Sequence, residues 1–249
     1  MHSQILTILA SAALAAAQTN TNLQTTFPTP SGTTHLAAVK TIAAGQSHDG
    51  GMKQWDRNPS TCNDQSEGGE KDAVFILQDG ATLSNVIIGP NNGEGVHCKG
   101  RCTLNNVWWT DVCEDAATFR GTTGTSYVNG GGAREASDKV FQHNGNGLVA
   151  VKNFYAKNIG KLYRSCGNCG TQYARHSTFT NIKIEGSSQV VAGVNANYGD
   201  STQVKDSCIL KGAACWIYQG NSNGKEPTKI ASGPSGTACV ASAVKTAGC

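Results

Sequence analysis

Three carboxylates, Asp111, Glu114 and Asp115, lie close together in the stretch 109-WTDVCEDAATF-119, and Glu94 precedes them. Clustered carboxylates repel and raise one another's pKa, so a folded chain holds them mainly where a cation or a substrate offsets their charge. Calcium takes about six to eight oxygen ligands, many of them from carboxylates. We therefore predict that these four residues bind Ca²⁺. Because the sequence contains no EF-hand loop, a solvated acidic turn stays open as the alternative.

A second group of charged residues is mainly basic and follows the acidic one in the chain. Lys139 lies beside Asp138, and Lys161 and Arg164 lie in 160-GKLYRSCGNCG-170. Apolar and glycine-rich neighbours distinguish these cations from ordinary solvated charges. Lys161 and Arg164 are three residues apart, which does not place them on one face of a strand unless a turn separates them. These residues are therefore candidates for chemistry, and the alternative is that each is a solvated surface charge.

Other catalytic patterns are missing from the sequence. It has no G-x-S-x-G element, phosphate-binding loop or dinucleotide fingerprint. We interpret His97 as structural, and His143 as either a corner residue or a cleft residue. The formal net charge of +3, with no run of basic residues, is too small to indicate nucleic-acid binding. It suits a polyanionic substrate.

The chain begins with the features of an exported protein. Residues 1–17, MHSQILTILASAALAAA, contain no acidic group and end in the small residues of an A-x-A cleavage site, which predicts a secretory signal peptide. No later segment approaches the roughly 20 apolar residues of a membrane span. We expect a soluble, secreted, extracellular protein that starts near Gln18 and has no membrane anchor.

Ten cysteines agree with secretion, because in an oxidising compartment an even number indicates disulfide bonds. Sequence does not determine connectivity, and pairing of neighbours is the simplest hypothesis. It joins Cys98 to Cys102, Cys166 to Cys169, Cys208 to Cys215 and Cys239 to Cys249, with Cys62 and Cys113 left over. Zinc binding by Cys98, Cys102 and 166-CGNC-169 is a weaker alternative, since a second C-x-x-C is missing.

A short strand-like phrase recurs along the chain, as in 82-TLSNVIIG-89, 103-TLNNVWWT-110 and 178-TFTNIKIEG-186. Its central Asn or Asp falls at residues 85, 106, 129, 153, 181 and 206, in steps of 21 to 28 residues. A repeat of this length cannot bury its own apolar face and must stack on its neighbours. The spacing predicts an all-β fold, a parallel β-helix with one turn per repeat, and a β-sandwich is the alternative. We expect the recurring Asn to form a ladder at one corner, where it tolerates a left-handed backbone.

The repeat also predicts the organisation of the chain. We expect one domain over residues 18–249, with a core at about 38–220 and a disulfide-stapled tail at 221–249. Residues 18–37, rich in Thr and Pro, either lie over the fold or form a linker. Side chains on successive turns of a β-helix lie about 4.8 Å apart, so the acidic and basic groups are expected on one face.

Six phrases support a specific resemblance. They are 41-TIAAGQSHDGG-51, 73-AVFILQDG-80, 79-DGATLSNVIIG-89, 94-EGVHCKGRCTLNNVWWTDVCEDAATF-119, 138-DKVFQHNG-145 and 160-GKLYRSCGNC-169. In this order they resemble the pectate lyases of polysaccharide lyase family 3, from about residue 26 to residue 220. The resemblance implies a secreted, single-domain, right-handed parallel β-helix, expected to be a monomer. The implied activity is cleavage of α-1,4-linked polygalacturonate by calcium-dependent β-elimination.

The resemblance also implies roles for individual residues. Lys139 matches the family's Brønsted base, Lys161 and Arg164 match its basic neighbours, and Asp138 matches an acid beside the base. Asp111, Glu114 and Asp115 match the acidic calcium cluster, and Glu94 stands where family members often have Asp. A further acid matches either Glu67 or Glu70. Because neighbouring cations disfavour a charged lysine, we expect the pKa of Lys139 to be lowered.

Two alternatives belong to other functional classes. A hydrolytic polygalacturonase would need a pair of carboxylates acting on water, and its own family phrases are missing here. A non-enzymatic β-helix that binds or adheres to the plant cell wall is the other alternative, and only a lyase would generate an ultraviolet-absorbing unsaturated product.

Overall fold

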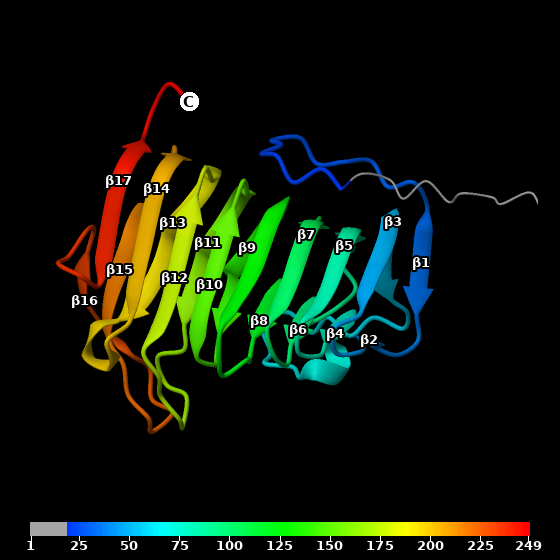
Figure 1. Ribbon diagram of the computed structural model, residues 1–249, viewed down its shortest axis with the longest axis horizontal. Helices are drawn as coiled ribbons and strands as arrows, with labels where there is room; N and C mark the ends of the chain where they lie inside the picture. Colours follow the sequence, from blue (N-terminus) through cyan, green and yellow to red (C-terminus); the bar gives the residue numbers. More distant parts are fainter. Residues whose placement is uncertain (1–18) are drawn as a thin grey trace, which may run out of the picture.

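The structure is a computed structural model that describes residues 19–249, and the predicted signal peptide at residues 1–17 lies outside them. The described chain consists of strands stacked in sequence order along the long axis of the molecule (Figure 1), with two short 3₁₀ turns, η1 (Glu70–Asp72) and η2 (Ala196–Tyr198). The strands are β1 (Thr33–Leu36), β2 (Lys40–Ile42), β3 (Ser47–Arg57), β4 (Phe75–Leu77), β5 (Ala81–Ile88), β6 (Val96–Cys98), β7 (Cys102–Trp109), β8 (Ala117–Phe119), β9 (Thr125–His143), β10 (Gly147–Lys152), β11 (Tyr155–Ser165), β12 (Arg175–Thr180), β13 (Lys183–Asn195), β14 (Ser201–Ile209), β15 (Ala213–Gln219), β16 (Thr228–Ser232) and β17 (Cys239–Lys245). Nearly all strand pairs are parallel, which confirms the predicted parallel β-helix, here of about eight turns.

Three parallel sheets form the sides of this β-helix, and the long strands bend from one sheet into the next. Sheet 1 contains β2, β4, β6 and β8, the last residues of β9, β11 and β13, and then β15. Sheet 2 contains the first residues of β3, β5, β7 and β9, followed by β10, β12, β14 and β17. Sheet 3 contains β1, the later parts of β3, β5, β7 and β9, the first parts of β11 and β13, and the last residues of β14.

The interior is filled by side chains that repeat from turn to turn. In sheet 1, register pairs Val96 with Ala117, Ala117 with Phe141 and Phe141 with Tyr163. All four are buried in one continuous apolar cluster. Burying a large apolar side chain contributes roughly 1.5–3 kcal/mol, so this shared interior holds adjacent turns in register.

The corner between sheets 2 and 3 carries the predicted ladder. Asn85, Asn106, Asn153, Asn181 and Asp206 have positive φ values of 56°, 54°, 59°, 52° and 51°. The Asn106 amide donates to Asn85 Oδ1 at 2.9 Å, and the Asn181 amide donates to Asn153 Oδ1 at 2.7 Å. Asn tolerates this left-handed backbone better than other residues with a side chain, which explains why it recurs.

The prediction for Asn129 was wrong by one residue. Asn129 pairs with Asn105, so the corner position of this turn belongs to Gly130, whose φ is +69°. A Cβ at Gly130 would lie 2.8 Å from Thr21 Cα, because the N-terminal segment crosses the ladder at this point. The Asn153 amide donates to Thr21 O at 2.8 Å and so bridges the gap in the ladder.

The N-terminal segment therefore lies over the fold, one of the two possibilities left open by its sequence. In Figure 1 it runs along the rim of the β-helix above β5, β7 and β9. Leu23 and Phe27 pack against Trp108, Tyr155 and Ile87, which project outward from sheet 3. The Phe27 ring meets the Trp108 ring edge-on, with centroids 5.1 Å apart.

The disulfides correct half of the predicted pairing. Cys98–Cys102 and Cys166–Cys169 are present, and the two left-over cysteines form Cys62–Cys113. The predicted Cys208–Cys215 and Cys239–Cys249 bonds are wrong, since the actual pairs are Cys208–Cys249 and Cys215–Cys239. Cys208 lies beside Lys183 in sheet 3 and Cys215 beside Ala192 in sheet 1, so these sequence neighbours point to different sides of the β-helix.

The tail belongs to the β-helix rather than merely being stapled to it. β17 pairs in parallel with β14 and adds a rung to sheet 2 beyond residue 220. β16 pairs antiparallel with β15 at the same end. Within residues 19–249 no helix is long and apolar enough to cross a membrane.

Candidate active site

Four charged side chains occupy equivalent positions on four successive turns of the β-helix. Each lies where its turn enters sheet 1. Register pairs Val96, Ala117, Phe141 and Tyr163, and two residues before each of them stand Glu94, Asp115, Lys139 and Lys161. We call these four residues the charged row. Two acids on the earlier turns thus meet two lysines on the later turns, as the spacing of the repeat predicted.

A second row runs beside the charged row on the same outer face of sheet 1. Its members lie three residues after those of the charged row. It consists of His97, Thr118, Gln142 and Arg164, which are paired in register, and we call it the polar row. In β11 the consecutive residues Leu162 and Tyr163 both point into the core. This bend lets Lys161 and Arg164, three residues apart, line the same cleft.

The acidic part of the site contains three carboxylates that converge. Ligand oxygens of Glu94, Glu114 and Asp115 lie within 4.8 Å of one another, and the three residues are only 4%, 3% and 5% exposed. Burial raises the pKa of Glu114, and it raises the pKa of Asp115 well above its usual range. Glu114 Oε2 and Asp115 Oδ1 have no hydrogen-bond partner among residues 19–249. Buried, unsatisfied carboxylate oxygens of this kind fit a hard divalent cation such as Ca²⁺.

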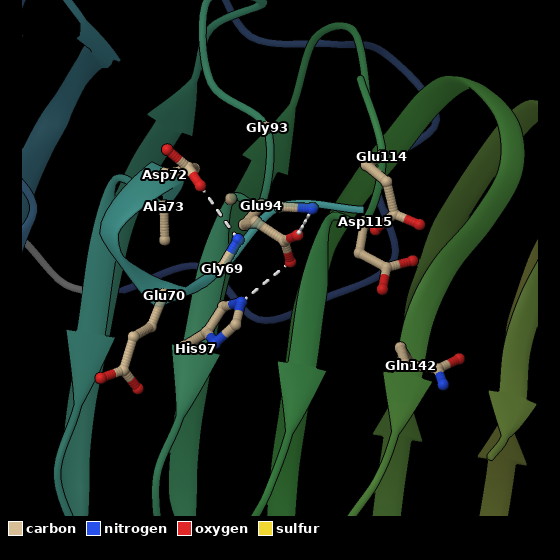
Figure 2. Close-up of polar contacts among 12 residues, drawn as sticks. Gly69, Glu70, Asp72, Ala73, Gly93, Glu94, His97, Glu114, Asp115 and Gln142 are labelled. Carbon is tan, nitrogen blue, oxygen red and sulfur yellow. Dashed lines mark hydrogen bonds and ion pairs between the residues drawn. The ribbon is translucent and has the colours of Figure 1, made fainter. Parts of the chain in front are cut away.

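Glu94 is held in place from two sides (Figure 2). Glu94 Oε1 accepts a hydrogen bond from the Gly68 N–H at 3.0 Å, and Glu94 Oε2 lies 2.9 Å from His97 Nε2. The turn that carries Glu94 is tied down as well, because the Asn92 side chain donates to buried Asp56 and accepts from the Gly95 N–H. His97, which we had interpreted as structural, therefore contacts the acidic group directly.

The structure distinguishes Glu67 from Glu70, which sequence left unassigned. Glu67 lines the cleft together with Glu94 and Asp115. Glu70 pairs with Lys99 and Arg120 and, in Figure 2, points away from Glu94. Of the two acids, only Glu67 faces the acidic group.

Asp111 does not join this group, contrary to the prediction from sequence. Its side chain is exposed, whereas Glu114 and Asp115 are buried. Burial of part of the carboxyl and the nearby Glu135 raise the pKa of Asp111. The chain turns between Asp111 and Glu114 at the end of β7, which directs the two carboxylates to different places.

Lys139 lies at the centre of the charged row and contacts three acids. Its Nζ is 2.8 Å from Asp138 Oδ2, 3.0 Å from Glu114 Oε1 and 3.6 Å from Asp115 Oδ1. Burial opposes the ammonium charge, but Asp115, Glu114 and Asp138 outweigh it and raise the pKa of Lys139. The expected lowering is therefore wrong for this state of the protein, because the nearest charges are carboxylates rather than cations.

Asp138 bridges the two lysines of the charged row, since its other oxygen accepts from Lys161 Nζ. Burial disfavours the charged carboxylate, but the hydrogen bonds from Lys139 and Lys161 outweigh it and lower the pKa of Asp138. Asp138 therefore fixes the relative positions of Lys139 and Lys161.

Arg164 is buried and almost completely held by neighbours that sequence reasoning missed. Its Nη1 donates to Ser165 O at 2.6 Å and to Asn195 Oδ1 at 3.1 Å, and its guanidinium lies 3.9 Å from the Tyr218 ring centroid. Asn195 is oriented in turn by Asp200, which accepts from its backbone and side-chain N–H groups. The buried Nη2 has no hydrogen-bond partner in the described part of the chain, and Arg164 lines the cleft. Burial lowers the pKa of Arg164 without removing its charge.

The sequence of this chain is similar to those of known pectate lyases. The family profile described as pectate lyase matches residues 24–225. Pectate lyase E of Emericella nidulans is 49% identical over 84% of this chain and 82% of its own. Probable pectate lyase D of Aspergillus fumigatus is 45% identical over 94% of this chain and 93% of its own.

Solved structures show the same similarity. The catalytic domain of pectate lyase PelI from Erwinia chrysanthemi superposes with a TM-score of 0.69 at 30% identity, over 87% of this chain and 97% of that one. PelI in complex with tetragalacturonic acid superposes with a TM-score of 0.67, also at 30% identity, over 87% of this chain and 69% of that one.

Proposed function

The chain belongs to the pectate lyase family and is a polysaccharide lyase, and from this premise we propose how its cleft acts. The substrate is α-1,4-linked polygalacturonate, cleaved by β-elimination that depends on calcium. Glu94, Glu114 and Asp115 hold the Ca²⁺ ion, Lys139 is the Brønsted base, and Lys161 and Arg164 bind the substrate carboxylate. Asp138 belongs to the substrate-binding cleft through its contacts with both lysines.

One observation carries this proposal. The charged row places the buried carboxylates of Glu94 and Asp115 on two turns and the amines of Lys139 and Lys161 on the next two. Asp115 Oδ1 and the adjacent Glu114 Oε2 have no hydrogen-bond partner within residues 19–249. A protein that only bound pectate would gain nothing from burying Lys139 among acids, since surface cations attract a polyanion at lower cost.

The reaction starts at a carbon acid. The C5 hydrogen of galacturonate lies α to the C6 carboxylate, so its removal places negative charge on that carboxylate. Bound calcium would act as a Lewis acid that stabilises this charge. Arg164 Nη2, unpartnered in the cleft, is placed to donate to a carboxylate oxygen, and Lys161 adds a second positive charge.

Lys139 must be neutral to take the proton. Its pKa is raised by Asp115, Glu114 and Asp138. A cation held by Glu114 and Asp115 would offset the charge of these carboxylates, which would weaken their hold on the ammonium and favour the neutral amine of Lys139. A neutral Nζ then accepts the C5 hydrogen as a proton.

The electron pair of the broken C5–H bond forms the C4–C5 double bond, and the C4–O4 bond breaks with its electrons passing to oxygen. That oxygen takes a proton from water or from a protonated side chain. The products are a shortened chain and a 4,5-unsaturated galacturonide, with no net consumption of water.

The product identifies the reaction. We expect polygalacturonate treated with the purified protein to yield an ultraviolet-absorbing unsaturated sugar. This activity should disappear with a chelator and return with added Ca²⁺. New reducing ends without ultraviolet absorbance would indicate the hydrolase, and binding without cleavage would indicate the non-enzymatic alternative.

We further propose that the protein is secreted and acts as a monomer. The sequence of residues 1–17 and the five disulfides within residues 19–249 support an oxidising, extracellular location. Mass spectrometry of the protein recovered from culture medium should find an N-terminus near Gln18, and light scattering should find one chain per particle.

A further inference from the structure

The polar row contains two side chains that the proposed reaction does not use. Thr118 and Gln142 lie on the two turns between His97 and Arg164. Thr118 Oγ1, Gln142 Oε1 and Arg164 Nη2 are all shielded from solvent and have no hydrogen-bond partner within residues 19–249. Buried polar atoms are nearly always satisfied in folded proteins, because leaving one unpaired costs free energy. Three unpaired atoms on consecutive turns of one cleft therefore indicate a polar ligand that satisfies them.

The chemistry of each atom limits what it can bind. Gln142 Nε2 donates to Asn144 Oδ1 at 2.8 Å, which leaves Oε1 as an acceptor. An acceptor repels a carboxylate and attracts a hydroxyl group. Arg164 Nη2, on the next turn, is a donor and suits the carboxylate. The Thr118 hydroxyl can donate or accept.

The position of Gln142 joins the two parts of the cleft. It borders the space that also contains Lys139 and Arg164, and it borders the space that contains Glu94, Asp115 and Thr118. Adjacent turns are about 4.8 Å apart. This distance is comparable with the distance across a pyranose ring, from the C6 carboxylate to the secondary hydroxyls. A sugar whose carboxylate meets Arg164 therefore brings a hydroxyl to Gln142.

We propose that Gln142, assisted by Thr118, accepts a hydrogen bond from an O2 or O3 hydroxyl of bound galacturonate and thereby selects polymer that is not O-acetylated. This inference rests on the proposed function, since it takes galacturonan to be the occupant of the cleft. Acetylation replaces the donor hydrogen by an ester, whose carbonyl would face Gln142 Oε1 as acceptor against acceptor. A site built to bind a hydroxyl rejects an analogue that lacks one, because the buried polar atom is left unpaired.

The test compares two substrates, polygalacturonate and the same polymer after chemical O-acetylation. The variant Gln142→Met keeps the length of the side chain and removes its polar atoms. On the unmodified polymer we expect its KM to rise about tenfold, with kcat within about twofold, as for the loss of one neutral hydrogen bond to bound substrate. On the acetylated polymer its KM should match that of the wild type, so the preference for unmodified polymer shrinks about tenfold. Thr118→Val should shift the preference in the same direction by less.

Gln203→Met is the matched control, because Gln203 is an exposed glutamine on β14 in sheet 2. It should leave both substrates unaffected, and equal thermal midpoints should show that all variants are folded. An equal rise in the KM of Gln142→Met on both polymers would overturn the proposal. A wild-type enzyme that cleaves both polymers equally well would overturn it too.

Failure of the proposed function would look different, because neither polymer would yield the unsaturated product. In that case calorimetry measures the affinity of the wild-type protein for saturated oligogalacturonates with and without acetyl groups. This comparison tests the selectivity without relying on cleavage. Binding that does not distinguish them would again contradict the role of Gln142.

Discussion

Lys139 shows how strongly a residue's chemistry depends on its immediate neighbours. The acids that we propose as calcium ligands also hold the Lys139 ammonium, with Glu114 Oε1 3.0 Å from Nζ. We infer that ammonium and calcium compete for Glu114 and Asp115. In the proposed mechanism, Lys139 would release its proton once these carboxylates served as metal ligands.

Replacing the two cations should separate their roles. Lys139→Ala should lower kcat by at least roughly 10²-fold, the usual effect of losing a general base, with little change in KM. Arg164→Lys keeps the charge but loses the planar fork, so it should lower kcat and raise KM. Lys205→Ala, a lysine of β14 in sheet 2, serves as the control and should resemble the wild type. If Lys139→Ala kept near wild-type kcat while Arg164→Ala abolished activity, the two roles would have to be exchanged.

The raised pKa of Asp115 predicts a pH-dependent stability in chelator. A carboxyl whose pKa is higher in the folded than in the unfolded state binds a proton more tightly when folded, so its charge destabilises the fold at higher pH. Asp115→Asn should therefore be more stable than the wild type at neutral pH. This advantage should shrink as the pH falls below the raised pKa of Asp115 and should be gone below the ordinary carboxyl pKa of about 3.8. Urea unfolding at a series of pH values measures it. A wild type that stays more stable than Asp115→Asn at neutral pH would show that contacts with Lys139 dominate over burial.

Sequence predicted most of the charged residues that the structure brings together in the cleft, but not all of their neighbours. Glu94, Glu114, Lys139, Lys161 and Arg164 could be found because motif resemblance reports charge and order along the chain. Asp111 was misplaced because the direction of a carboxylate after a strand depends on the turn that follows. Asn195 and Tyr218, which hold Arg164, come from later turns and have no pattern of their own.

At the scale of elements, the bend within each sheet 1 strand decides what faces the cleft. Two consecutive core residues, such as Val140 and Phe141, let the residues on either side point outward. Lys139 and Gln142 are placed in this way, and so are Lys161 and Arg164. Strict alternation along a strand would have buried one member of each pair.

The ladder offers a test of how the corners are stabilised. Asn106 has a φ of 54°, donates to Asn85 Oδ1 and accepts from Trp108 Nε1 at 2.8 Å. Asn106→Ala forces Ala into a left-handed backbone at a cost of roughly 1–2 kcal/mol and leaves buried partners unpaired at about 1–3 kcal/mol. We expect a loss of roughly 2–4 kcal/mol in the free energy of unfolding. Urea unfolding monitored by circular dichroism measures it.

Asn129→Ala is the matched control for that measurement. Asn129 has an ordinary backbone and donates one bond to Asn105 Oδ1 at 2.9 Å, so its loss should cost about 1 kcal/mol or less. Equal losses for the two variants would contradict the role assigned to the left-handed corner.

The fold was predictable from spacing because every turn must bury the same kind of apolar face on its neighbours. Finer features depend on contacts between distant segments. Gly130, next to Asn129, takes the corner position where Thr21 crosses. Cys215 of sheet 1 pairs with Cys239 of sheet 2 rather than with Cys208, because the buried side chains of these two cysteines meet in the interior of the β-helix.

Across the whole molecule, the acidic group joins two successive turns. Glu94 precedes β6, whereas Glu114 and Asp115 precede β8, so an ion bound by all three links neighbouring turns. Calcium at about 100 times its dissociation constant should stabilise the folded protein by about 2.7 kcal/mol. Magnesium at the same concentration should do less, because it demands smaller and more regular coordination.

Thermal unfolding with each ion measures this effect, and Asp115→Asn provides the control. That variant should lose most of the calcium-dependent shift while keeping the same β-rich circular dichroism spectrum. A shift that persists undiminished in Asp115→Asn would place the stabilising ion elsewhere on the molecule.

The most direct test of the proposed mechanism is a crystal structure of Lys139→Ala with calcium and a saturated oligogalacturonate. The mechanism predicts calcium about 2.3–2.6 Å from oxygens of Glu94, Glu114 and Asp115. It also predicts one sugar with its carboxylate on Arg164 and its C5 hydrogen facing the space that the Lys139 side chain leaves. Calcium bound away from these three carboxylates, or a C5 hydrogen that faces Arg164 with residue 139 out of reach, would contradict it.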